Sequence, residues 1–138
     1  MTFARKNNPG HGRGVQEARR EAPPADEAAL MDAIRLALGQ REDIVLWRNN
    51  VGLTEYWDGK SVSVVKYGLA NGSADFVGVL LPGGRFVAFE VKTRTGRATP
   101  EQLQWLALVR RFGGFACIVR SVDEAIAAVA RAKGGASE

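Results

Sequence analysis

Two dense apolar runs separated by a turn constrain the fold of this chain more than any other feature. The runs occupy residues 76–81 and 86–91, and Pro82-Gly83-Gly84 lies between them. Neither run alternates apolar with polar residues, as a strand with one face in water would. The sequence therefore predicts an antiparallel hairpin near the centre of a sheet.

Segments on either side of this hairpin predict further strands and a helix. Apolar residues recur at helical spacing over residues 26–38, and Gly39 follows as a stop. Runs typical of strands occupy residues 44–47 and 62–65, and we expect these two to pair as a hairpin, with Asp58-Gly59 as a turn between them. Residues 115–119 form another strand.

Two capping boxes mark the starts of the later helices. Thr99 is suited to the N-cap position and Gln102 to reach back to it, which predicts a helix to about residue 112. Ser121 and Glu124 repeat the pattern before a helix that ends near residue 133. The elements together predict an α/β fold with a mixed central sheet flanked by helices.

Length and charge predict one folded domain that follows a basic arm. A chain of 138 residues buries one core but divides poorly into two domains. Residues 1–25 carry five basic and two acidic residues, a net charge of +3, which leaves +1 of the chain's +4 for residues 26–138. We expect a flexible arm over 1–25, which either holds a phosphate backbone without reading sequence or remains an idle solvated tail.

Several classes of protein are disfavoured by the composition. No apolar run approaches the ~20 residues needed to cross a bilayer, and the first residues form no apolar signal peptide. We therefore expect a cytoplasmic protein without a membrane partner. Cys117 is the only cysteine, which excludes an internal disulfide and a cysteine zinc cluster, and its apolar neighbours predict a buried, inert thiol.

Asp75, Glu90 and Lys92 are the candidates for chemistry. Residues two apart on a strand share a face, so Glu90 and Lys92 project together. Asp75 joins them if the central turn has two residues, which places it opposite Lys92, or four, which places it opposite Glu90; a three-residue turn would send it to the other face. Charges at the end of so apolar a run indicate either a functional site or an interior ion pair of Lys92 with a carboxylate.

Two carboxylates beside a lysine suit the hydrolysis of phosphate esters. Mg²⁺ takes oxygen ligands and often accepts only one or two carboxylates, which leaves positions for water and substrate phosphate. The metal would polarise the phosphate and lower the pKa of a bound water. Lys92 would orient that water or offset charge that develops on the phosphate.

Short motifs follow one another in a recognisable order over residues 26–133. They are Arg48-Asn49-Asn50-Val51-Gly52, Tyr67-Gly68, Gly72-Ser73-Ala74-Asp75, Phe89-Glu90-Val91-Lys92-Thr93, Thr95-Gly96-Arg97 and Thr99-Pro100-Glu101-Gln102. In this order they resemble the virus-type replication-repair nuclease domain, VRR-NUC, of the PD-(D/E)xK superfamily. Ala74 departs from the family pattern, which usually has proline there, a turn residue and not a ligand. The resemblance implies a single restriction-endonuclease-like domain over residues 26–138.

The resemblance also implies roles for individual residues. Asp75 and Glu90 would bind the metal together with the backbone carbonyl of Val91, and Lys92 would be the catalytic base. The implied cofactor is Mg²⁺, for which Mn²⁺ would substitute. Gln102 would belong to the active site, although its capping box explains it equally well.

Residues outside this group complete the candidate site. Glu27 matches an acidic residue that such nucleases often carry on their first helix, and its spacing places it on the stripe that faces the core. Arg94 and Arg97 follow Lys92 in a loop that would lie beside the site, where they could grip phosphates that flank the cut. Arg48 and Lys66 are weaker candidates for the same role.

The tryptophans raise the question of partners. We expect Trp47 and Trp105 in the core, whereas Trp57 lies beside the turn at residues 58–59, where it could stack on unpaired bases. An apolar surface around Leu53, Tyr56 and Trp57 would also suit a homodimer, which the resemblance implies.

The function implied by the resemblance is a DNA endonuclease, structure-specific for branched DNA, in phage or bacterial replication and repair. One alternative is a Holliday-junction-resolvase-like or restriction-like nuclease of the same superfamily. The other is a nucleic-acid-binding module without catalysis, against which the intact Asp75, Glu90 and Lys92 weigh.

Overall fold

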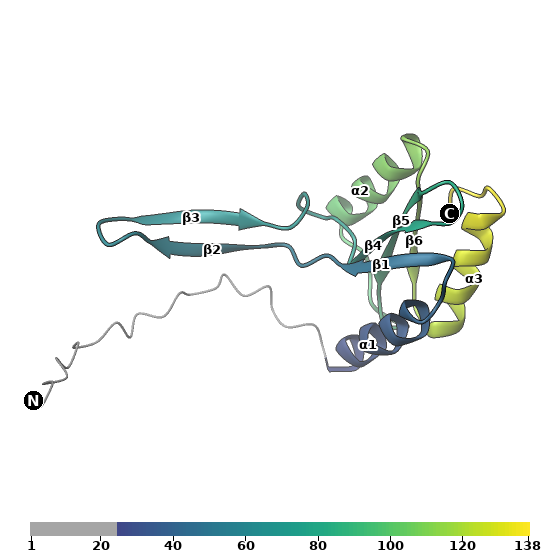
Figure 1. The fold of residues 1–138 in the computed structure, drawn as a ribbon. Coiled ribbons are helices and arrows are strands. Elements are labelled where there is room, and N and C mark those ends of the chain that lie inside the picture. The colour runs from purple at the N-terminus through teal and green to yellow at the C-terminus, as the bar shows by residue number, and fades with distance from the viewer. Residues whose placement is uncertain (1–24) are drawn as a thin grey trace, which may run out of the picture.

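The computed structural model describes residues 25–138, which form an α/β arrangement of helices and strands (Figure 1). The elements in chain order are α1 (Ala25–Gly39), β1 (Ile44–Arg48), β2 (Gly52–Trp57), β3 (Val62–Tyr67), β4 (Phe76–Leu80), β5 (Arg85–Val91), α2 (Pro100–Arg111), β6 (Phe115–Val119) and α3 (Val122–Lys133). The basic arm predicted over residues 1–25 lies outside the described residues, apart from Ala25, where α1 begins. The predicted mixed sheet flanked by helices is confirmed.

The main sheet has four strands in the order β1-β4-β5-β6. Its first three strands are antiparallel, and β6 runs parallel to β5 because α2 returns the chain to the same end of the sheet. Leu80 pairs with Arg85, so residues 81–84 form a four-residue turn. Of the registers that the sequence left open, this is the one that places Asp75 opposite Glu90.

The predicted pairing of residues 44–47 with residues 62–65 is wrong. β1 pairs with β4, with which it buries Ile44 and Leu80, whereas β3 pairs with β2, a strand that the sequence analysis did not predict. β2 and β3 mix polar with apolar residues and form a separate hairpin that projects away from the sheet (Figure 1). Its turn at Asp58-Gly59 is as predicted, since the Asp58 carboxylate accepts hydrogen bonds from the backbone amides of Lys60 and Ser61 at 2.8 Å each.

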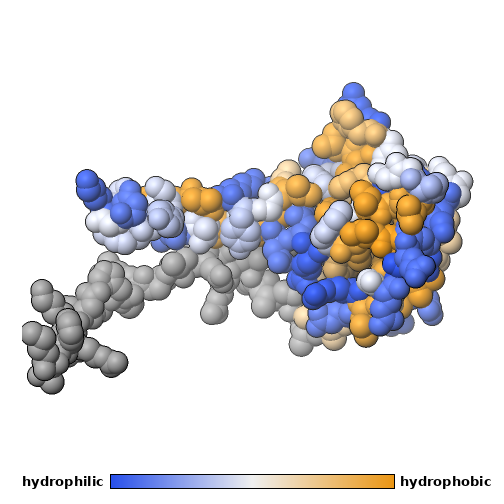
Figure 2. Space-filling view, viewed as in Figure 1, coloured by the Kyte–Doolittle hydropathy of each residue, from blue (hydrophilic) through white to orange (hydrophobic). Residues whose placement is uncertain are grey.

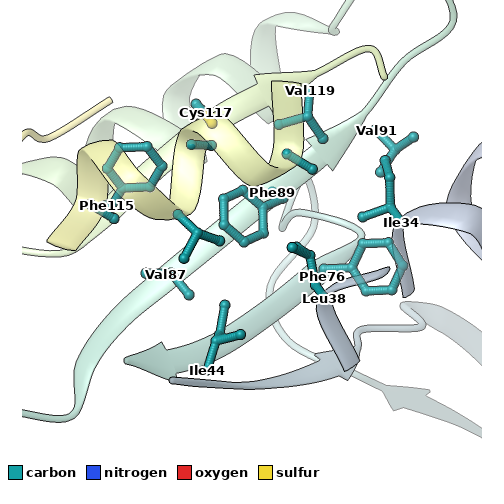
Figure 3. Packing of buried hydrophobic residues seen from close by; sticks show 14 of the residues in the cluster. Ile34, Leu38, Ile44, Phe76, Val87, Phe89, Val91, Phe115, Cys117 and Val119 are labelled. Atoms are coloured by element: carbon teal, nitrogen blue, oxygen red, sulfur yellow. The ribbon is translucent and has the colours of Figure 1, made fainter. Parts of the chain in front are cut away.

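Helices cover both faces of the main sheet. α1 and α3 pack on one face over the larger core, in which Phe76, Phe89 and Phe115 are fully buried (Figure 3). α2 packs on the other face over β5 and β6 and buries a smaller group that includes Leu106. Within residues 25–138, no helix is long and apolar enough to cross a membrane.

The outer face of β1 lies beyond the reach of α2. Trp47 is 53% exposed there, so its predicted place in the core is wrong. Ile44 and Leu46 point to the face of the sheet that α1 covers. Trp47 points to the opposite face, where α2 covers β5 and β6 but leaves β1 exposed. Trp105 does pack against the smaller core, where its ring meets Phe86 edge to face.

The helix starts match their sequence signals to different degrees. At α2, the Thr99 hydroxyl accepts from the backbone amide of Gln102 at 3.2 Å, and the Gln102 side chain accepts from the backbone amide of Thr99 at 2.9 Å. At α3, Ser121 caps the amide of Glu124, but the Glu124 carboxylate accepts from the amide of Arg120 instead of returning to Ser121. The first capping box is thus complete, and the second is displaced by one residue.

The lone cysteine is buried as predicted. Cys117 lies on β6 in the larger core, and burial raises the pKa of its thiol to about 11. A thiol with so high a pKa carries little of the reactive thiolate at neutral pH.

Candidate active site

Asp75, Glu90 and Lys92 meet at one end of the main sheet. Along β5, Val87, Phe89 and Val91 face the larger core, so Glu90 faces the α2 side. Asp75 immediately precedes β4 and stands opposite Glu90 in the register, which directs it to the same side. Both carboxylates are nearly inaccessible, at 4% exposed for Asp75 and 1% for Glu90.

Hydrogen bonds from neighbouring elements orient the two carboxylates. The Asp75 Oδ2 atom accepts from the backbone amide of Val91 at 2.9 Å. The Glu90 Oε1 atom lies 2.9 Å from the Lys92 ammonium nitrogen and accepts from Gln102 Nε2 at 2.7 Å. The interior ion pair that the sequence offered as an alternative is therefore present, between Lys92 and Glu90, within the group of candidate catalytic residues.

Gln102 forms the capping bond that the sequence predicts and also contacts one of the candidate catalytic residues. Its Oε1 atom completes the capping box by accepting from the Thr99 amide, while its Nε2 atom donates to Glu90. The two ends of one amide thus connect the first turn of α2 to the carboxylate on β5. A glutamine fits this place because it offers one acceptor and two donors on a neutral group.

The donor atoms of the site suit a hard divalent cation. In an extended strand the N–H and C=O of one residue point to the same edge. Because the Val91 amide donates to Asp75, the Val91 carbonyl faces the Asp75 side as well. Two carboxylates and this carbonyl form an all-oxygen set of the kind that Mg²⁺ accepts when water fills its other positions. Within residues 25–138, no cluster of three or more His, Cys, Asp or Glu residues suits a metal.

Glu27 lies in the first turn of α1 and is half-buried, on the stripe that includes Met31 and Ile34. Ile34 lies beside Val91 in the larger core (Figure 3), so the preceding turns of α1 extend toward the end of the sheet that bears the site. α1 nevertheless covers the face opposite the one to which Asp75 and Glu90 point. The structure therefore places Glu27 on the helix that covers the opposite face of the sheet from Asp75 and Glu90.

The basic candidates occupy two different regions. Arg94 and Arg97 are exposed in the loop that follows Lys92, as predicted. Arg48 ends β1 with its side chain exposed on the α1 side of the sheet, and Lys66 lies on the hairpin opposite Leu53. Of these four residues, only Arg94 and Arg97 lie in the loop that directly follows Lys92.

Two residues near the site were missed by the sequence reasoning. Arg120 follows β6, and its guanidinium donates to the backbone carbonyls of Thr93 at 2.6 Å and Gly96 at 2.7 Å, which holds the loop that carries Arg94. Asn49 is buried after β1 and bonds to the segment before Asp75. Its place in the first quoted motif was the available signal, but no local pattern revealed its partners.

An α/β domain with two buried carboxylates and a lysine at one end of its sheet has the arrangement expected of nuclease domains with a PD-(D/E)xK-type centre. The model of the VRR-NUC domain family matches residues 31–123, which is more than half of the chain. The chain therefore belongs to the VRR-NUC family, as its motifs predicted, and is a member of a nuclease family. No curated protein matches the chain at a significant level.

Proposed function

We propose that the protein is a Mg²⁺-dependent DNA endonuclease that hydrolyses phosphodiester bonds. The observation that carries this proposal is the convergence of Asp75, Glu90 and Lys92 at one end of the sheet of a VRR-NUC domain. The contact of Gln102 with Glu90 adds a fourth polar group to the same site.

Under this proposal the carboxylates of Asp75 and Glu90 and the Val91 carbonyl hold Mg²⁺, or Mn²⁺ in its place. When bound, the ion supplies Lewis-acid polarisation of the phosphate and a more acidic water. Lys92 serves as the catalytic base or orients the attacking water, and its ammonium form offsets negative charge on the phosphate. Gln102 keeps the Glu90 carboxylate aimed at the site, and Glu27 would act from the end of α1.

The test is cleavage of labelled flap, splayed, four-way and plain duplex DNA with and without Mg²⁺. Asp75→Asn and Glu90→Gln are expected to abolish cleavage and to leave folding and most DNA binding intact, because each removes a ligand charge and little volume. Asp123→Asn removes an exposed carboxylate in the first turn of α3 and is the matched control. Full activity in either site variant, or cleavage that persists in EDTA, contradicts the metal assignment.

We propose branched DNA as the substrate, met in replication or repair in the cytoplasm. Arg94 and Arg97, on a loop next to Lys92, would grip the phosphates beside the cut, and Arg48 and Lys66 would contact more distant DNA. Preference for the four-way DNA would favour the resolvase-like alternative. Equal cleavage of plain duplex would favour the restriction-like one, and tight binding of all four DNAs without any cleavage would favour a binding module.

A homodimer is part of the same proposal, because two exposed apolar surfaces could form its interface. On the hairpin, the register places Trp57 opposite Val62, and the same face carries Leu53 and Val64. On the main sheet, Trp47 and its neighbours stay uncovered beyond α2. Figure 2 shows apolar side chains mixed with polar ones along the hairpin and gathered more densely above β1.

Light scattering at micromolar concentration should give a mass near twice 14.9 kDa. Trp57→Glu should return the protein to the monomer, with loss of branched-DNA cleavage, if the hairpin is the interface. Trp47→Glu tests the sheet face in the same way. A monomeric wild type that cuts branched DNA at full rate contradicts the dimer.

The basic arm is proposed to hold DNA nonspecifically. Deleting residues 1–24 removes all of the +3 charge of the predicted arm. Because released counterions make such binding salt-dependent, the deletion should weaken DNA binding and flatten its salt dependence without moving the cleaved position. If the deletion variant binds DNA with the same affinity as the full chain at every salt concentration, the arm has no role in binding.

A further inference from the structure

All the polar atoms of the Asn49 side chain form hydrogen bonds with the loop over residues 69–74. Asn49 is 6% exposed, directly after β1. Its Nδ2 atom donates to the Ser73 hydroxyl at 2.7 Å and to the Ala74 carbonyl at 2.8 Å, and its Oδ1 atom accepts from the Leu69 amide at 3.3 Å. Both side-chain donors and the side-chain acceptor are thus bound to the loop that leads into β4.

The same residue also holds Asp75 through the backbone. The Asn49 backbone amide donates to the Asp75 backbone carbonyl at 2.8 Å. This bond lies just beyond the last pair of the β1-β4 ladder, Arg48 and Phe76. Asp75 is therefore fixed at two points, at its carbonyl by Asn49 and at its carboxylate by the Val91 amide. Displacement of the preceding peptide would disturb both points.

The preceding segment depends on Asn49 for its position. Ser73 and Ala74 are fully buried but belong to no strand. Ala74 lacks the ring by which a proline would fix its φ angle, so the hydrogen bond from Asn49 to its carbonyl is an added restraint on this peptide. Gly72 packs so closely under α2 that an added Cβ would meet the Glu101 carbonyl at 2.6 Å, which limits movement on the other side. Loss of the Asn49 side-chain amide would therefore allow the peptide between Gly72 and Asp75 to move.

We propose that Asn49 is the positioning residue for Asp75, holding the metal ligand in place through Ser73 and Ala74. The inference rests on the proposed role of Asp75 as a ligand of Mg²⁺. Outer-shell groups of this kind typically change metal affinity by about 10–100-fold when they are removed. Substitution of Asn49 should therefore weaken Mg²⁺ binding even when no DNA is present.

The test measures the Kd for Mg²⁺ by calorimetry on the full chain without DNA. Asn49→Leu removes both donors and keeps the number and branching of the side-chain heavy atoms, and Asn49→Asp replaces the donating amide with acceptors. The expected result is a Kd raised by about tenfold or more for both. The added charge of Asn49→Asp would by itself attract the cation, so a loss of affinity there identifies the lost donors as the cause. The control is Asn50→Asp, which adds the same charge at the neighbouring exposed position and should not weaken binding.

Folding is checked separately, by circular dichroism and thermal unfolding. If Asn49→Leu fails to fold, Ser73→Ala provides the milder case, because it removes one acceptor and leaves the bond to Ala74. Ser73→Ala should raise the Kd by a smaller factor, in keeping with a shared role. A folded Asn49 variant or Ser73→Ala that binds Mg²⁺ as tightly as the wild type overturns the positioning role. A wild type that binds no Mg²⁺, or Asp75→Asn that binds it unchanged, overturns instead the proposed metal site on which the inference rests.

Discussion

Comparison of Gln102→Met with Thr99→Ala separates the role of Gln102 in the capping box from its bond to Glu90. Gln102→Met keeps a side chain of similar length but removes the acceptor for the Thr99 amide and the donor for Glu90. Thr99→Ala removes only the N-cap hydroxyl, so the contact between Gln102 and Glu90 remains. Each variant loses one of the two bonds of the capping box, so the difference between the variants reports the bond to Glu90.

The expected magnitudes follow from these bonds. Loss of an N-cap side chain costs about 1 kcal/mol, which is the expectation for Thr99→Ala. A hydrogen bond to a charged group contributes about 1.5–3 kcal/mol, and Glu90 is buried and has limited access to water that could replace the lost donor. Gln102→Met should therefore cost about 3 kcal/mol in all, since it also loses half of the capping box. At about 4 °C per kcal/mol for a chain of this size, Tm should fall by about 12 °C for Gln102→Met and about 4 °C for Thr99→Ala.

The assay combines thermal unfolding with DNA cleavage in saturating Mg²⁺. Thr99→Ala should cleave at nearly the wild-type rate at a temperature where it is fully folded. Gln102→Met should be slower at the same temperature, because the Glu90 carboxylate loses one of the groups that orient it. Equal losses of stability in the two variants, with equal cleavage rates, would refute the reasoning.

Two further predictions concern residues away from Gln102. Burial raises the pKa of the Cys117 thiol from 9.0 to about 11, so the contribution of the neutral thiol to the free energy of unfolding is complete below pH 9 and is lost as the pH rises through about 11. Urea unfolding at a series of pH values should show this loss in the wild type and not in Cys117→Ala. Arg120→Met should release the loop that carries Arg94 and raise the Kd for DNA at constant kcat, with partial rescue by Arg120→Lys; a changed kcat with unchanged Kd would contradict a role in DNA binding.

The predictable parts of the fold are those that local chemistry decides. The capping box of Thr99 and Gln102 fixed the start of α2 because all of its partners lie within three residues. The apolar runs of β4 and β5 identified the central hairpin for a similar reason. The partner of β1 was mispredicted because adjacency in sequence favoured β3, whereas burial of Ile44 against β4 decides the pairing.

The sequence predicted the members of the candidate site, but their arrangement depended on the number of residues in the turn between β4 and β5. Strand alternation places Glu90 beside Lys92 whatever the register, but the position of Asp75 required the turn at residues 81–84, whose glycines permit more than one length. Asn49 could not be assigned a role, because its side chain bonds to Ser73 and Ala74, 24 and 25 residues further along the chain. Such partners are brought near only by the pairing of β1 with β4, which is the pairing that the sequence did not reveal.

The two carboxylates depend on different parts of the fold for their orientation. Asp75 is held by the segment after β1 and by the Val91 amide on β5, whereas Glu90 is held by Gln102 on α2 and by Lys92. Because Gln102 lies on α2 and Asn49 follows β1, loosening α2 should disturb Glu90 first and loosening the end of β1 should disturb Asp75 first. A cation that binds both carboxylates would bind tightly only when both regions are packed, and its binding free energy would then add to the stability of the complete domain.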